Sequence, residues 1–240
     1  MRGYLKLQLL AIARNKRYLI FTVVLPVVLY ISITASIHGS DSHKYAVAYL
    51  STMCVFGMMS CVLMTTGPAI ANERKSGWLR QVRLMPLSDR AVFGGKIGAA
   101  MAMALPSLVA VALAARFVKG IHLGTGQWIE LVLAVWLGAI PFAAIGVFIG
   151  YLLEGESARM ISALLHSALA FLGGLYFPIT SGGMHKVMEV TPSYRVYQLG
   201  SNVMHNESLS IAAIGILLAY TVAFSALATL RIRRAGGLSA

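Results

Sequence analysis

The sequence predicts an all-α integral membrane protein with six transmembrane helices, and its composition and charge pattern support this prediction. Hydrophobic residues make up 58% of the 240 residues and charged residues only 12%, whereas soluble domains typically contain about 25% charged residues. The net charge of +12 would indicate a nucleic-acid partner in a soluble protein. In so apolar a chain, it indicates cationic segments that lie on one side of a membrane.

Six apolar segments have the length of a transmembrane helix, which needs about 20 mainly apolar residues. They cover about residues 18–37, 45–70, 91–116, 127–153, 157–178 and 209–230. Pro26, Pro106 and Pro141 fall inside these segments, where membrane helices tolerate kinks. The first segment follows a basic leader, as in a signal peptide, but it is longer than a signal core of about 7–15 residues. We therefore predict a retained span and treat residues 1–240 as one domain.

The distribution of lysine and arginine predicts the orientation. With the N-terminus in the cytoplasm, fifteen of the twenty Lys and Arg residues lie in cytoplasmic segments, as the positive-inside rule requires. Five lie outside: Lys44, Arg116, Lys119, Lys186 and Arg195. Both termini are then cytoplasmic, and the leader is predicted to form an interfacial helix on the cytoplasmic surface. We expect a multi-pass protein of the bacterial inner or plasma membrane, in contact with lipid and not with nucleic acid.

The segment between spans two and three has an amphipathic pattern when residues 71–85 are placed on a helix. Its apolar stripe consists of Ala71, Trp78, Val82 and Met85. Its polar face consists of Glu73, Ser76, Arg80 and Arg83. Pro86 ends this predicted helix. Because the polar face has charges of both signs, a protein surface suits it better than anionic lipid alone. A solvated basic loop that only sets the topology is the alternative.

Three motifs along the chain resemble one known family. The first consists of Glu73, Arg74, Gly77, Trp78 and Leu79, followed in the sequence by Pro86-Leu87-Ser88. The second is GGLYFP at residues 173–178, followed by TPSY at residues 191–194, and the third is RNKR at residues 14–17 ahead of a span with a central proline. In their order and spacing these motifs resemble the ABC-2 type transporter permeases, which include antibiotic and daunorubicin-resistance exporters. The resemblance covers essentially the whole chain.

The resemblance implies functions for two segments. In that family the cytoplasmic loop is a coupling helix that docks in a cleft of a separate ATP-binding subunit. The residues with an implied ATPase-coupling role are Glu73, Arg74, Gly77, Trp78, Leu79, Arg80, Arg83 and Pro86. Position 78 departs from the family's commoner threonine, which affects the docking geometry. The resemblance also implies short re-entrant or interfacial helices between spans five and six, where the residues alone predict an ordered external loop.

No ATP site is predicted on this chain. Arg90 stands where a phosphate-binding loop ending at Lys96 would need its first glycine. ATP and Mg²⁺ are therefore expected on the partner ATPase subunit. The six histidines show no metal-binding spacing, and the serines show no nucleophile motif. We expect no catalytic, cofactor or metal site on this chain, which would not be an enzyme by itself.

A substrate path is only weakly indicated. The acidic residues lie at span ends, and His166 is the ionisable residue near the middle of a span. It is either a helix-packing hydrogen bonder or part of a substrate path. Met58 belongs to a methionine set with Met53, Met59 and Met64, which is either an adaptable cargo surface or lipid-facing filler. Tyr176 and Phe177, at the exit of span five, are the other two candidates for the path.

Small residues form a stripe on span four. The stripe consists of Ala139, Ala143, Gly146 and Gly150. Such residues let two helices approach closely. The stripe is either a dimer seam or, as we favour, packing within the chain.

The resulting prediction is the permease half of an ABC-2 type exporter that moves a hydrophobic or amphiphilic molecule outward. Six spans are too few to enclose a path alone, so we expect a second permease copy or homologue and two ATPase subunits. An ion-coupled secondary transporter is the main alternative, although such carriers usually need buried acids. A non-transporting membrane anchor or sensor subunit is the other alternative.

Overall fold

The computed structural model describes residues 20–38, 42–77, 89–176 and 183–237. The elements in these ranges are a short π-helix, η1 (Ile20–Val24), and the α-helices α3 (Leu25–Ser36), α4 (Ser42–Lys75), α6 (Asp89–Val118), α7 (Thr125–Leu137), α8 (Ile140–Leu152), α9 (Gly155–Leu172), α10 (Gly183–Val190), α11 (Pro192–Met204) and α12 (Ile211–Gly237). The all-α prediction is confirmed for this part of the chain. The predicted leader helix lies outside it.

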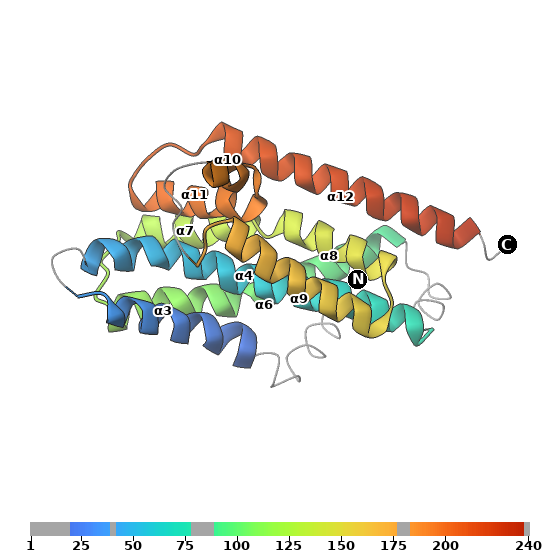
Figure 1. Ribbon diagram of the computed structural model, residues 1–240, viewed down its shortest axis with the longest axis horizontal. Helices are drawn as coiled ribbons and strands as arrows, with labels where there is room; N and C mark the ends of the chain where they lie inside the picture. Colours follow the sequence, from blue (N-terminus) through green and yellow to red (C-terminus); the bar gives the residue numbers. More distant parts are fainter. Residues whose placement is uncertain (1–19, 39–41, 78–88, 177–182, 238–240) are drawn as a thin grey trace.

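Helix α4 forms the centre of an elongated bundle (Figure 1). It has 34 residues and contacts α3, α6, α8, α9 and α11. Its two ends lie at opposite ends of the bundle (Figure 1). We name these the Ser42 end, where α6 ends and α7 begins, and the Lys75 end, where α8 ends and α9 begins. Most of α4 is buried because neighbouring helices surround it.

Within the described ranges, four helical stretches are long and apolar enough to cross a membrane: Ser42–Lys75, Gly94–Val118, Thr125–Leu152 and Ile211–Ile232. They coincide with predicted spans two, three, four and six. In the place of span one lies a shorter apolar helix, Thr22–Ser36. In the place of span five lies α9, whose polar residues lower its hydropathy. By length and composition the structure thus supports four spans, and the other two stay predictions.

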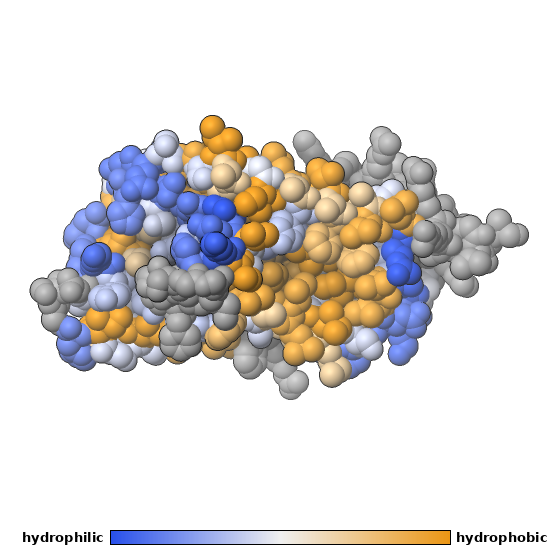
Figure 2. Space-filling view, turned by 45° about the horizontal axis from the view of Figure 1, so that its top comes forward, coloured by the Kyte–Doolittle hydropathy of each residue, from blue (hydrophilic) through white to orange (hydrophobic). Residues whose placement is uncertain are grey.

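The outside of the bundle has an apolar belt. Figure 2 shows hydrophobic residues across the middle of the molecule, with hydrophilic residues toward both ends. Leu164 of α9 and Val222 of α12 are 63% and 67% exposed. A continuous apolar surface of this kind is typical of a membrane or protein contact and not of a solvated face.

The small-residue stripe packs against α4 within the same chain. A Cβ atom added at Gly150 would lie only 2.7 Å from the Cβ of Ile70, and one added at Gly146 would collide with the Thr66 hydroxyl. Ala139 and Ala143 are fully buried. The interpretation of the stripe as intrachain packing is therefore confirmed, and α4 and α8 approach closely because these side chains are small or absent.

The segment between α9 and α12 holds α10 and α11, where the family resemblance implied short helices. Helix α11 is packed into the bundle and is not a solvated loop. The Oγ of Ser193 donates to the carbonyl oxygen of Leu169 at 2.7 Å, and the Oγ of Ser51 on α4 donates to the carbonyl oxygen of Tyr197 at 3.1 Å. Gly173 has no side chain, and this lets the end of α9 lie against Ser193.

Candidate functional site

A buried ion pair joins α4 to α6 at the Lys75 end. The Nζ of Lys96, on α6, donates to the Oε2 of Glu73, on the last turn of α4. The Lys96 side chain is 5% exposed and that of Glu73 is 19% exposed. Lysine is rarely buried unless it is paired, so this pair explains how a cation sits inside the bundle. Because the 78–88 segment connects these two helices, the pair bridges both flanks of that segment.

Arg74, the next residue, binds a different helix. Its Nη1 donates to the carbonyl oxygens of Gly150 at 3.0 Å, Tyr151 at 2.8 Å and Leu153 at 3.4 Å. Its guanidinium carbon lies 5.6 Å from the centre of the Tyr151 ring. The last carbonyls of a helix lack intrahelical partners and form the negative end of the helix dipole. Arg74 therefore caps the C-terminus of α8 from α4.

We name Glu73, Arg74, Lys96 and the carbonyl oxygens at the C-terminus of α8 the base cluster. Its hydrogen bonds all involve a charged group, and such bonds are about twice as strong as neutral ones. The cluster contains no nucleophile paired with a base. Its contacts hold the last turn of α4 to α6 and to the C-terminus of α8.

The predicted helix over residues 71–85 is wrong at its start. Ala71 belongs to α4, which ends at Lys75, and Gly77 adopts a φ of +74°. The Gly77 amide donates to the carbonyl oxygen of Arg74 at 3.3 Å. A glycine in the left-handed region commonly ends a helix, so the chain turns here and the amphipathic pattern cannot continue from Ala71 in one helix.

Five of the predicted coupling residues lie outside the part of the chain that the structure describes. They are Trp78, Leu79, Arg80, Arg83 and Pro86. The other three, Glu73, Arg74 and Gly77, lie at or just after the end of α4, directly before residues 78–88 in the sequence. Their coupling role stays a prediction, and the sequence offered no signal that Lys96 would pair with Glu73.

The weak substrate-path candidates lie in the middle of the bundle. The Nε2 of His166 lies 3.4 Å from the carbonyl oxygen of Phe56, and the two rings meet edge to face at 4.7 Å. Phe56 also contacts the ring of Tyr176 at 5.7 Å. His166 thus makes a helix-packing contact between α9 and α4, one of its two predicted roles. Phe177 lies outside the described ranges.

Met58 lies in the core. Met53, Met58 and Met59 are fully buried, so the interpretation of these three as lipid-facing filler is wrong. The spacing of the methionines could not predict this, because burial depends on which helices surround α4.

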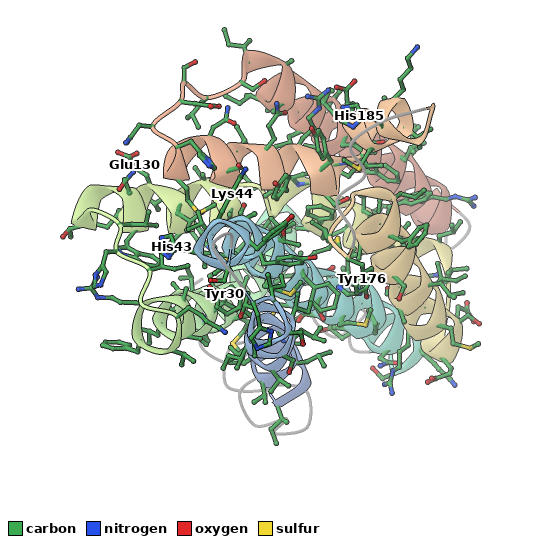
Figure 3. The ribbon with its side chains drawn as sticks, turned by 60° about the vertical axis from the view of Figure 1, so that its left-hand side comes forward. Tyr30, His43, Lys44, Glu130, Tyr176 and His185 are labelled. Carbon is green, nitrogen blue, oxygen red and sulfur yellow. The ribbon has the colours of Figure 1, made fainter. Side chains whose placement is uncertain are left out.

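A pocket of about 500 Å³ lies at the Ser42 end, and the sequence analysis missed it. It is lined by the start of α4, the backbone after α9, α10 and α11. Its main side chains are Lys44, Tyr45, Tyr49, His185, Tyr194 and Tyr197. Figure 3 labels Lys44 on α4 and His185 on α10. The tyrosine spacings, four and three residues apart, place each pair on one helix face and are a signal that could have predicted such a surface.

Comparisons with known proteins agree with the motif resemblance. Residues 33–230 match the family model described as ABC-2 family transporter protein. The chain is also similar to YvfS of Bacillus subtilis (strain 168), which has the provisional name of a transport permease. The two are 28% identical over 217 residues, which cover 89% of this chain and 89% of YvfS.

Proposed function

The chain belongs to the ABC-2 family of transporter proteins, and on this premise we propose that it is the permease subunit of an exporter driven by a separate ATPase subunit. Its cargo is a hydrophobic or amphiphilic molecule, such as a drug, another natural product or a lipid-like compound. The observation that carries this proposal is the base cluster, because it ties both flanks of the 78–88 segment to the membrane helices.

The Lys75 end faces the cytoplasm in this proposal. The basic residues at 80–90 follow α4 directly in the sequence, and those at 231–234 belong to the end of α12. The end of α12 lies at the same end of the bundle as the end of α4 (Figure 1). This distribution accords with the excess of Lys and Arg in cytoplasmic loops.

Helices α3 and α9 complete six spans. Together η1 and α3 reach the lower end of the range of about 17–25 residues for a spanning helix. Helix α9 places Ser162 and His166 on its buried side, whereas Met160 and Leu164 are at least 60% exposed. An apolar face toward lipid and a polar stripe toward the bundle suit a membrane helix.

In this proposal the 78–88 segment passes the motion of the ATPase subunit to the membrane helices. Arg80 and Arg83 contact the ATPase subunit, whereas Trp78 and Val82 hold the segment to the spans. Closure of the ATP-bound form of the ATPase displaces the segment. Glu73 and Arg74 already have partners within the chain, so their part is to pass the displacement on to α6 and α8. Two ATPase subunits hold the ATP and Mg²⁺, and two permease chains enclose the path.

The test uses the full chain and its ATPase subunit, co-purified and reconstituted in lipid vesicles. Arg80→Ala lowers permease-stimulated ATP hydrolysis and cargo export at least about tenfold, since loss of one partner of an interfacial charge pair costs about 2–5 kcal/mol. Arg116→Ala is the matched control, because Arg116 is exposed near the Ser42 end, and it leaves both activities unchanged. Equal activity of Arg80→Ala and the native chain would contradict the coupling role.

The same vesicles separate the two alternatives. An ion-coupled carrier exports cargo without nucleotide and stops when the ion gradient is collapsed. An anchor or sensor subunit binds the ATPase subunit without any cargo flux. ATP-dependent flux that survives collapse of the gradient supports the exporter over both.

A further inference from the structure

We propose that the pocket at the Ser42 end binds an amphiphilic anion, with the anionic group at Lys44 and the apolar or aromatic body among the tyrosines. This inference rests on the proposed function, because it names the class of molecule that the exporter releases. The anionic group is a carboxylate, sulfonate or phosphate. Neither the sequence motifs nor the family match assigns a ligand to this pocket.

The charge of the pocket favours an anion. Lys44 is exposed, and the ion pairs found among the described residues do not include it. Among the described residues that line the pocket there is no Asp or Glu. The other cationic group in the lining, His185, lies 3.6 Å from the carboxylate of Glu189, so its charge is balanced when it is protonated. Lys44 therefore leaves one uncompensated positive charge at the mouth of the pocket.

The walls favour an apolar or aromatic body. Tyr194 and Tyr197 have their ring centres 6.0 Å apart, and the His185 ring meets Tyr194 edge to face at 6.2 Å. Tyr45 and Tyr49 from α4 line the same pocket. Tyrosines offer a large apolar surface with a hydroxyl at one end. The volume of about 500 Å³ lies within the range of about 300–1,000 Å³ for small-molecule sites.

Close packing of the end of α9 against α11 fixes the position of two walls of the pocket. Gly173 and Gly174 line it with backbone, and Gly174 turns the chain with a φ of +68°. A Cβ atom at Gly173 would lie 2.8 Å from the Cβ of Ser193, so only glycine allows this approach of α9 to α11. Preformed walls lower the ordering cost of binding.

The position of the pocket fits the release side of an exporter. It lies at the end of the bundle opposite to the 78–88 segment. Two of its walls, α10 and α11, follow α9 in the chain, and α9 contacts α4 and α8. A shift of α9 against α4 therefore changes the width of the pocket. Cargo in this pocket contacts the tyrosines and Lys44 before it is released into water.

The test measures binding of two probes to the full chain in phosphatidylcholine nanodiscs by isothermal titration calorimetry, without nucleotide or ATPase subunit. The probes are 2-naphthoate and the uncharged 2-naphthamide, which share one aromatic body. We expect 2-naphthoate to bind saturably and Lys44→Gln to weaken its binding about tenfold, as for loss of a hydrogen bond to a charged group. Lys44→Gln leaves 2-naphthamide binding unchanged. Lys119→Gln removes a charge outside the pocket and changes neither.

Several results would overturn the assignment. They are absence of saturable 2-naphthoate binding, equal weakening of both probes by Lys44→Gln, and an equal effect of Lys119→Gln. Loss of 2-naphthoate binding in nanodiscs enriched in phosphatidylglycerol would identify a lipid head group as the occupant instead of an exported anion. Failure here leaves the coupling role of Arg80 untouched, and Arg80→Ala, which acts at the other end, leaves probe binding unchanged.

Discussion

Glu73 and Arg74 are adjacent in the chain but bind different helices. Glu73 pairs with Lys96 of α6, and Arg74 caps the end of α8. The family resemblance implied that both contact an ATPase. In the structure both charged groups are already engaged inside the chain. Two neighbouring side chains thus join three helices at the point where the 78–88 segment begins.

Substitution of the Glu73–Lys96 pair separates its structural role from its coupling role. Lys96→Met removes the Nζ that pairs with the carboxylate of Glu73, and breaking a buried pair costs about 3–5 kcal/mol. We expect a matching loss in the free energy of unfolding of the detergent-solubilised chain. The double variant Glu73→Leu/Lys96→Met recovers most of that loss, because apolar replacement of a buried pair is often neutral.

The recovered double variant is the informative one for function. If the pair transmits the displacement of the loop, this variant stays folded but loses permease-stimulated ATP hydrolysis. Arg159→Met/Glu156→Leu is the matched control, since that pair is exposed, with its atoms 3.8 Å apart. Full activity of the folded Glu73→Leu/Lys96→Met variant would show that the pair is only structural.

At the scale of helices, α4 and α8 approach each other closely. This contact depends on the absence of side chains at Gly146 and Gly150, which face Thr66 and Ile70. This contact places the C-terminus of α8 beside the last turn of α4. The capping by Arg74 therefore depends on Gly150, in the last turn of α8, and on Gly146, one turn before it.

A pair of glycine variants tests this packing. Gly146→Ala forces a methyl group against Thr66, and overpacking of this kind costs about 1–3 kcal/mol. Gly215, on α12, has no atom within 4 Å of an added Cβ, so Gly215→Ala is neutral or gains up to about 1 kcal/mol in helix propensity. Thermal unfolding of both variants in detergent measures the difference. Equal stabilities would contradict the close contact.

At the scale of the whole molecule, the proposed function places the two ends of the bundle on opposite sides of the membrane. A single cysteine at His122, near the Ser42 end, or at Glu154, at the Lys75 end, reports its side, because both positions are exposed. A membrane-impermeant maleimide added to intact spheroplasts labels His122→Cys and not Glu154→Cys. The native Cys54 and Cys61 are buried and give a low background.

Permeabilised cells are the control for this labelling. Both variants are labelled there, which shows that Glu154→Cys is reactive. Labelling of Glu154→Cys in intact spheroplasts would reverse the proposed orientation. The 78–88 segment would then face away from any ATPase subunit in the cytoplasm, and the coupling proposal would fail.

The sequence by itself determined the all-helical membrane class of the protein and the positions of four long apolar helices. Apolar runs of sufficient length predicted the four stretches that can cross a membrane, because a helix satisfies its backbone hydrogen bonds locally and lipid supplies none. The motifs around Glu73 and Gly173 indicated the family, because short motifs can be recognised directly along the chain. The small-residue stripe on α8 predicted close packing, since helix periodicity places its members on one face.

Only the tertiary structure decided which side chains meet. Glu73 and Lys96 are separated by 23 positions, Arg74 and the end of α8 by more than 75, and the tyrosine-lined pocket combines residues from Lys44 to Tyr197. Burial of Met58 likewise depends on the helices around α4. The physical reason is that a charge or an aromatic ring finds its partner through the rotation and approach of packed helices, which no local pattern of residues encodes.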